Sequence, residues 1–338
     1  MRLLNYIVKR LLLILPVILG VSIIVFSLSR MTGGDPAAAY INDKMTELQI
    51  AQVYAKYHFD EPVWNQYWYW LQGIATGDWG WSITAVSPVT EAIKNKLPLT
   101  VELTLFSMLI GVTVGISLGT QTALRKDKMF DQVSRVISLL GVSIPIFWLA
   151  LIFQYVFFFK LGVLPISSAY SDEFVGKIPD ITGFIALDSL LVGNVRLFVD
   201  HMVHMIMPSV ALSFGTIAVL MRIQRNSMLE VLNLDYVKTA RAKGLDEKVV
   251  INKHARRNAL IPTTTVVGLS FGGSLGGAVL TESIFALPGM GRWAADSIRR
   301  LDTNSVLGFC LFIAIVYVLA NLIVDVMYAY LDPRVKLD

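Results

Sequence analysis

The sequence predicts an all-α membrane protein with six transmembrane helices. Of its 338 residues, 55% are hydrophobic and only 16% are charged, and the mean hydropathy is +0.61. This is more apolar surface than one soluble core can bury. Six apolar stretches are each long enough to cross about 30 Å of hydrocarbon at about 1.5 Å per residue. These stretches are 11–29, 99–123, 136–158, 203–221, 262–285 and 305–331.

The distribution of basic residues predicts that both termini are cytoplasmic. In that orientation, 18 of the 29 lysines and arginines fall in inside segments of about 68 positions in total, a density roughly three times that outside. Arg2, Lys9 and Arg10 precede the first span, as in a secretory signal, but its apolar core is too long, which predicts an uncleaved helix. The net charge of +4 follows from this topology and does not indicate nucleic-acid binding.

The first outside segment, 31–98, is predicted to be helical. Thr46 begins a capping-box sequence, and a second helix starts after Pro62 and ends at Gly77. Five of the seven tryptophans lie in this segment. They fit an aromatic belt at the lipid headgroups or a docking platform for an external partner. The platform candidates are Trp64, Trp68, Asp78 and Trp79.

Two spans carry glycines at helical spacing. Gly111, Gly115 and Gly119 recur every four residues in the second span, and 268–277 in the fifth span holds five glycines. This spacing favours close helix packing. The fifth-span glycines are alternatively candidates for lining a solute path. The path candidates are Ser143, Pro145, Gly273, Ser274, Gly277 and Glu282.

Charges within the spans are few. Glu102 and Glu282 lie near outer ends and Asp325 lies towards the inner end of the sixth span, where snorkelling or pairing with loops accounts for them. His201 and His204 have no acidic or thiol neighbour at metal-ligand spacing along the sequence, so we interpret them as interface residues. No series of acids and histidines crosses the membrane, which argues against proton coupling.

We identify no catalytic or nucleotide-binding motif in the sequence. It lacks the G-x-x-x-x-G-K-[ST] loop that cradles nucleotide phosphates, and it shows no Ser/His/Asp arrangement. The single cysteine, Cys310, excludes a disulfide framework within the chain. We therefore expect no catalytic residue, no metal and no cofactor in this chain.

The long inside segment, 222–260, predicts a helix–turn–helix on the cytoplasmic face. A helical run leads from Asp235 to Gly244, a suitable left-handed C-cap, and a second run follows. A basic loop resting on anionic lipid is the alternative. The ordered small residues before Gly244 exceed what charge anchoring needs.

This segment resembles the cytoplasmic coupling loop of permease subunits in binding-protein-dependent ABC importers. Lys238 stands where most such families have Glu, and Pro262 lies further beyond the glycine than usual. Both departures are similar to the peptide/nickel/opine branch, which includes the dipeptide and oligopeptide permeases. Matching motifs extend along the chain: GDP at 34–36, GDWGWS at 77–82, PIFWLAL at 145–151, ITGFIALDSLL at 181–191, LTESIFALPGMGRW at 280–293 and LDPRVK at 331–336.

The resemblance implies a type I ABC importer permease fold in a prokaryotic inner membrane, with 99–338 as the permease core. It implies a heterodimer with a homologous permease, two ATPase subunits that bind ATP and Mg, and an external solute-binding protein. The implied ATPase contact is Asp235, Tyr236, Thr239, Ala240, Arg241, Ala242, Lys243, Gly244 and Leu245. The implied outer ends of path helices include Glu282, Pro288, Gly289 and Gly291, of which Pro288 and Gly289 join the docking candidates.

The implied activity is non-enzymatic uptake of di- or oligopeptides by alternating access. Oligosaccharides and nickel complexes remain alternatives within the same branch. An ion-coupled secondary transporter and a non-transporting scaffold belong to other classes, and the first of these would need broken helices with midplane carboxylates.

Overall fold

The computed structural model describes residues 2–31, 35–42 and 44–331. Within them, four helical stretches are long and apolar enough to cross a membrane, and a helix pair with a sharp bend is a fifth candidate. Residues 15–31 form a shorter apolar helix. All six apolar stretches of the sequence are therefore mainly helical, although the third is interrupted. The long helices are α1 (Arg2–Met31), α4 (Val89–Leu124), α5 (Met129–Ser143), α8 (Val195–Leu232), α11 (Arg256–Ile284) and α13 (Thr303–Leu331).

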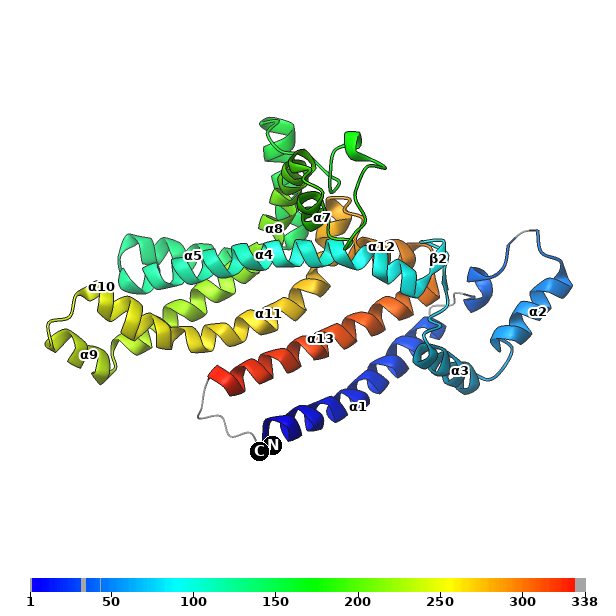
Figure 1. Cartoon of the computed structure of the whole chain (residues 1–338), viewed down its shortest axis with the longest axis horizontal. Coiled ribbons are helices and arrows are strands. Elements are labelled where there is room, and N and C mark those ends of the chain that lie inside the picture. The colour runs from blue at the N-terminus through cyan, green and yellow to red at the C-terminus, as the bar shows by residue number, and fades with distance from the viewer. Residues whose placement is uncertain (1, 32–34, 43, 332–338) are drawn as a thin grey trace.

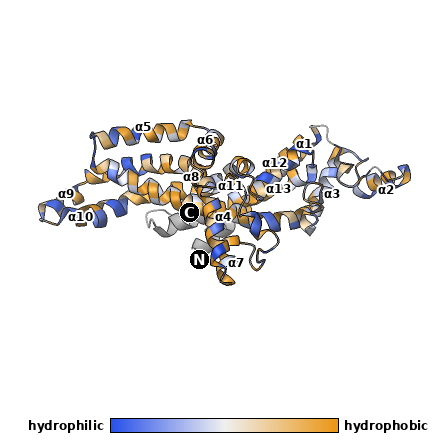
Figure 2. Cartoon of the chain, turned by 90° about the horizontal axis from the view of Figure 1, so that it is seen from above, coloured by the Kyte–Doolittle hydropathy of each residue, from blue (hydrophilic) through white to orange (hydrophobic). Residues whose placement is uncertain are grey.

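The long helices form a bundle with a different structure at each end (Figure 1). α4 lies along α8, α11 packs against both, and α13 lies between α11 and α1. One end carries α9 (Asp235–Ala242) and α10 (Glu247–Val249), and the other carries α2 (Glu47–Tyr57) and α3 (Val63–Thr76). Figure 2 shows that α9 and α10 are mostly hydrophilic, whereas α5 is largely hydrophobic.

Glycines allow α4 to approach α8 closely, as predicted. A Cβ added to Gly115 would lie 2.9 Å from the Cβ of Leu220, and one added to Gly119 would lie 2.6 Å from the carbonyl oxygen of Met221. A buried polar bridge then ties a third helix to this pair. Gln224 of α8 donates to Thr120 of α4 and accepts from Thr263 of α11, at 3.2 and 2.7 Å.

α4 begins earlier than the span predicted at 99. Its first turns, 89–98, alternate apolar with charged positions, so hydropathy alone does not reveal them. Val89 and Ile93 are buried on one side, where they pack with Met290 and Trp293 of α12 (Met290–Arg299). α8 likewise continues beyond the span predicted to end at 221, to Leu232.

The predicted span 136–158 is broken. α5 ends at Ser143, and α6 (Ile146–Phe153) continues as the π-helical η2 (Gln154–Lys160) at an angle of 105°. Ile144 adopts an extended conformation, with ψ of 124°, because the ring of Pro145 disfavours the helical region for the residue before it. The sequence analysis took this stretch as one span because both halves are apolar.

The segment before α4 is helical, as predicted, and is fixed to the bundle. The capping box at Thr46 forms, and Gly77 ends α3 with φ +89°. After η1 (Pro36–Ala39), α2 and α3, the short strands β1 (Trp81–Ser82) and β2 (Ser87–Pro88) pair antiparallel. Ser82 donates to the buried carboxylate of Asp302, just before α13, at 2.9 Å.

The segment between η2 and α8 folds around a buried carboxylate. It contains the turn η3 (Asp172–Phe174) and the helix α7 (Ile185–Leu191). Asp188 accepts hydrogen bonds from the backbone N–H groups of Ile181, Thr182 and Gly183 at 3.0–3.1 Å, and from the Thr182 hydroxyl. Burial would raise the pKa of Asp188, but these bonds outweigh it and hold the pKa below its usual value.

Candidate functional site

The predicted helix–turn–helix is present at one end of the bundle. α9 ends at Ala242, Gly244 follows with φ +76°, and α10 and the π-helical η4 (Val250–Ala255) lead into α11. The left-handed conformation predicted for Gly244 is therefore confirmed. A Cβ added to Gly244 would have no heavy atom within 4 Å, so space does not require glycine here. The left-handed backbone conformation does, because residues with a side chain rarely adopt it.

The predicted contact residues lie on two faces of the helix–turn–helix, one buried and one exposed. Val237 and Ala240 are buried and pack with Val250 of η4. The methyl group of Ala240 thus supports the loop and is not on its surface. The other predicted contact residues are exposed: Asp235, Tyr236, Thr239, Arg241, Ala242, Lys243, Gly244 and Leu245.

The exposed face combines apolar and charged groups. Tyr236 and Leu245 are 41% and 42% exposed. Arg241 pairs with Glu247 at 2.7 Å, which closes the turn around Gly244, and Lys238 pairs with Asp235 at 3.0 Å. Exposed aromatic and aliphatic groups among charges suit contact with another protein.

α9 is fixed to α11. The Tyr236 hydroxyl accepts a hydrogen bond of 2.8 Å from the side chain of Asn258, in the first turn of α11. The packing of Val237 against Val250 joins α9 to η4, which runs directly into α11. α9 is therefore attached both to η4 and to the first turn of the long helix.

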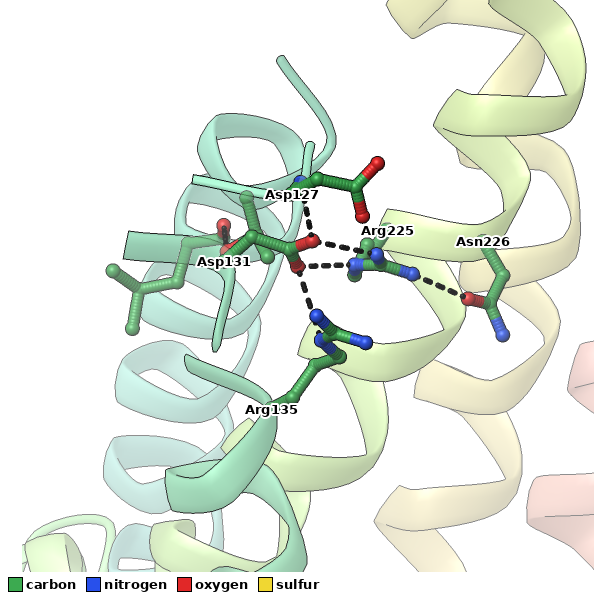
Figure 3. A network of polar contacts seen from close by, with 7 residues as sticks. Asp127, Asp131, Arg135, Arg225 and Asn226 are labelled. Carbon is green, nitrogen blue, oxygen red and sulfur yellow. Dashed lines mark hydrogen bonds and ion pairs between the residues drawn. The ribbon is translucent and has the colours of Figure 1, made fainter. Parts of the chain in front are cut away.

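A buried ion pair joins α5 to α8 near this end of the bundle (Figure 3). The Arg225 guanidinium donates to both oxygens of the fully buried Asp131 carboxylate, at 2.7 and 2.8 Å. The N–H of Asp127 donates to the same carboxylate at 3.0 Å, and Arg135 lies 3.7 Å away. The sequence analysis missed this pair because its partners are 94 residues apart.

The path candidates do not share one environment. Ser143 and Pro145 are exposed at the break between α5 and α6, and Gly273 is exposed on α11. Ser274 is buried, and its hydroxyl donates to the Ser270 carbonyl at 2.8 Å. Gly277 lies on α11, and its surroundings fall outside the described residues.

Glu282 is buried against the start of α12. It accepts from the Thr100 hydroxyl at 2.6 Å and from the backbone N–H of Arg292 at 3.0 Å. A Cβ on Gly289 would collide with this carboxylate. Of the two explanations offered for this charge, snorkelling and pairing with a neighbouring segment, the structure shows the pairing.

Glu102 and His201 form a second buried polar cluster. His201 Nε2 lies 3.1 Å from Glu102 Oε2, and the Ala186 N–H donates to Glu102 at 2.8 Å. His204 Nδ1 lies 3.5 Å from Asp200 Oδ2. Each histidine thus has one acidic neighbour, Glu102 of α4 for His201 and Asp200 of the same helix for His204, which the sequence analysis did not identify. In the part of the chain that the structure describes, no three His, Cys, Asp or Glu side chains group as metal ligands.

The docking candidates also differ in exposure. Trp64 and Trp68 of α3 are 82% and 58% exposed. Asp78 and Pro288 are exposed as well. Trp79 is half-buried and packs with the cluster around Val89, and Gly289 is buried against Glu282.

Apolar helices in a bundle, with a hydrophilic helix–turn–helix fixed to one of them, are the features of a multi-pass membrane protein. The chain belongs to the family described as "Binding-protein-dependent transport system inner membrane component", whose profile matches residues 111–337. The corresponding N-terminal profile matches residues 3–104. The chain is thus a permease of the inner membrane.

Several curated relatives match along almost their whole length. A "Dipeptide transport system permease protein DppB" from Alkalihalophilus pseudofirmus is 40% identical over 98% of this chain and 99% of the relative. A "Di/tripeptide transport system permease protein DppB" from Pseudomonas aeruginosa is 38% identical, and the dipeptide permease DppB of Escherichia coli K12 is 37% identical, each with the same coverage.

Proposed function

We propose that this chain is one of two homologous permease subunits of an ATP-driven importer of di- or oligopeptides. The names of the whole-length relatives support the peptide class. The observation that carries the mechanism is the exposed helix α9, which ends at the left-handed Gly244 and is fixed to α11. Such a helix can receive force from a separate motor subunit.

In this proposal, both termini and α9 face the cytoplasm, in agreement with the positive-inside bias. Two ATPase subunits bind ATP and Mg and contact the exposed face of α9. Their closure moves α9 and, through Asn258 and Val250, the helix α11. The bundle then alternates between outward-open and inward-open states. ATP-bound partners must favour one state over the other for this to occur.

The opposite end of the bundle receives the solute in this proposal. The exposed side chains of Trp64 and Trp68 offer a large apolar contact for an external binding protein or for lipid headgroups. The buried hydrogen bond of Ser82 to Asp302 ties β1, which follows α3, to the residue just before α13. A docked binding protein would therefore act on a fixed surface.

The test is Gly244→Val in the assembled importer, with Gly193→Val as the matched control. Both glycines have positive φ, of +76° and +71°, and both lack neighbours within 4 Å of an added Cβ, so each valine meets similar backbone strain. That strain is of order 1–3 kcal/mol. We expect Gly244→Val to reduce peptide uptake at least tenfold in proteoliposomes, through loss of ATPase attachment or of coupling, whereas Gly193→Val keeps uptake within about twofold.

Equal uptake by the two variants would contradict the coupling role of Gly244. Uptake that continues without any ATPase subunit would contradict the proposed class of transporter.

A further inference from the structure

A cavity of about 400 Å³ lies between α5 and α8, near the end of the bundle that carries α9 and α10. Its volume falls within the usual range of small-molecule sites, about 300–1,000 Å³. Asp131 of α5 binds Arg225 of α8, and Ser138 donates to the Ala218 carbonyl, so the two helices run antiparallel here. This register brings polar residues of both helices to the same end of the cavity.

The polar end of the cavity offers groups that a ligand can reach. Arg222 is exposed, and its side chain has no hydrogen bond or ion pair within the described residues. The Ser134 hydroxyl lies level with it, also lacks a partner among these residues, and is not one of the polar atoms closed to solvent. The Arg135 side chain is 52% exposed and lies 3.7 Å from Asp131, whose two oxygens Arg225 already binds (Figure 3).

The charge around this end of the cavity is strongly positive. Residues 122–135 and 222–226 contain six basic residues and two acidic ones. The basic residues are Arg125, Lys126, Lys128, Arg135, Arg222 and Arg225. Arg225 is neutralised by the buried Asp131, but Arg222 has no such partner among the described residues. An anionic ligand would offset the excess positive charge.

The rest of the lining is apolar. Leu139 and Val142 line the cavity further along α5, and both are exposed. The apolar surface of α5 continues beyond the cavity on Val136, Ile137 and Leu140, which are exposed as well. A matching ligand therefore has an anionic head and an apolar chain. Basic pockets between membrane helices bind lipid headgroups of this kind.

We propose that this cavity binds one anionic phospholipid, with its phosphate on Arg222 and Arg135 and an acyl chain against Leu139 and Val142. The Ser134 hydroxyl donates to a phosphate oxygen. Ser143, one of the path candidates, also lines the cavity, so a peptide is the competing occupant. A peptide with free termini has no net charge and would leave the positive charge of this end uncompensated. The lipid class does not depend on the transported solute, whereas the choice of the cytoplasmic leaflet rests on the proposed orientation.

The test measures equilibrium binding of dioleoylphosphatidylglycerol to the purified, delipidated importer in detergent, by native mass spectrometry. Dioleoylphosphatidylcholine, which has the same chains and a phosphate but no net charge, is the comparison ligand. We expect saturable binding of one phosphatidylglycerol at this site and at least fivefold weaker binding of phosphatidylcholine.

The first variant is Arg222→Gln, with Lys253→Gln as the matched control. Lys253 is an exposed basic residue of η4 at the same end of the bundle and does not line the cavity. The second variant, Val142→Trp, fills the cavity without a change of charge. We expect phosphatidylglycerol to bind at least fivefold more weakly to Arg222→Gln and to Val142→Trp, whereas its affinity for Lys253→Gln stays within twofold of wild type.

Several results would overturn the proposal. Equal affinity for the two lipids, or wild-type affinity in both variants, would exclude a site for an anionic headgroup. An equal loss in Lys253→Gln would show general attraction to a basic surface. Competition by inorganic phosphate would show a site for free anions, and competition by Ala-Phe would show part of the solute path. Binding to the isolated chain but not to the assembled importer would show that the second permease covers this face. If Arg222→Gln does not assemble, Val142→Trp decides.

The outcome is separable from that of the proposed function. Binding in detergent is the same whichever membrane surface this end of the bundle faces. Peptide uptake by wild-type importer without specific binding of phosphatidylglycerol refutes the lipid site and leaves the peptide importer standing. Absence of uptake of every di- and tripeptide tested refutes the proposed function and leaves the lipid site standing.

Discussion

Replacement of Arg225 by methionine tests how α5 is held on α8. Methionine is similar in length but removes the guanidinium that binds both oxygens of Asp131 at 2.7 and 2.8 Å. The Asp131 carboxylate is fully buried, so removal of the guanidinium leaves a buried charge without these two bonds. The Asp127 N–H at 3.0 Å and Arg135 at 3.7 Å remain near it.

The expected loss in the free energy of unfolding is about 3–5 kcal/mol, the usual cost of leaving one partner of a buried ion pair. The control is Arg196→Met. Its pair with Glu173 has a similar distance, 2.7 Å, but the arginine side chain is 78% exposed. Such surface pairs contribute about 0–1 kcal/mol. The double variant Arg225→Met with Asp131→Leu should recover most of the loss, because no buried charge is then left unpaired.

The assay is denaturant unfolding of the purified chain in detergent micelles, followed by the fluorescence of a dye on α5. Fluorescence there reports the separation of α5 from α8. If Arg225→Met is no more destabilising than Arg196→Met, the buried pair does not hold these helices. If the double variant is as unstable as the single one, the loss came from packing and not from the unpaired carboxylate.

Two further predictions concern packing and pH. Gly119→Leu should lower the stability of the chain by about 1–3 kcal/mol or more, because a side chain there meets the Met221 carbonyl. The control Gly215→Leu should change the stability little, because the space around Gly215 is open. Equal unfolding midpoints of the two variants in detergent would contradict this. The lowered pKa of Asp188 means that its stabilising effect is complete above the unfolded-state value of about 3.9 and is lost as the pH falls below it. After correction for the intrinsic pH dependence, hydrogen exchange of the amides at 181–183 should therefore accelerate only below about pH 4. The control variant Asp188→Asn should show no such acceleration. An equal acceleration in Asp188→Asn would refute the assignment.

Local sequence patterns predicted the local structure well. The capping box at Thr46, the end of α3 at Gly77 and the left-handed Gly244 are each set by residues within one or two turns, so a short window contains the information. The glycine repeat of α4 also predicted close packing, because its period alone places Gly115 and Gly119 on one face.

Contacts between distant segments could not be predicted. Asp131 meets Arg225, and Glu102 meets His201, only after α4, α5 and α8 have packed together, and nothing in the spacing along the chain indicates either pair. The buried side of Ala240 is a similar case, because the resemblance named a contact run without its orientation. The coupling, docking and path roles assigned from the sequence are not tested by these contacts and stay predictions.

Because η4 continues directly into α11, a tilt near α9 would move the whole of this long helix. With 29 residues, α11 is about 44 Å long. A tilt of about 5° at the end held by α9 would displace the opposite end by about 4 Å if the helix stays straight. Because Glu282 lies at that opposite end and holds the start of α12, a small rotation at one membrane surface would open or close contacts at the other.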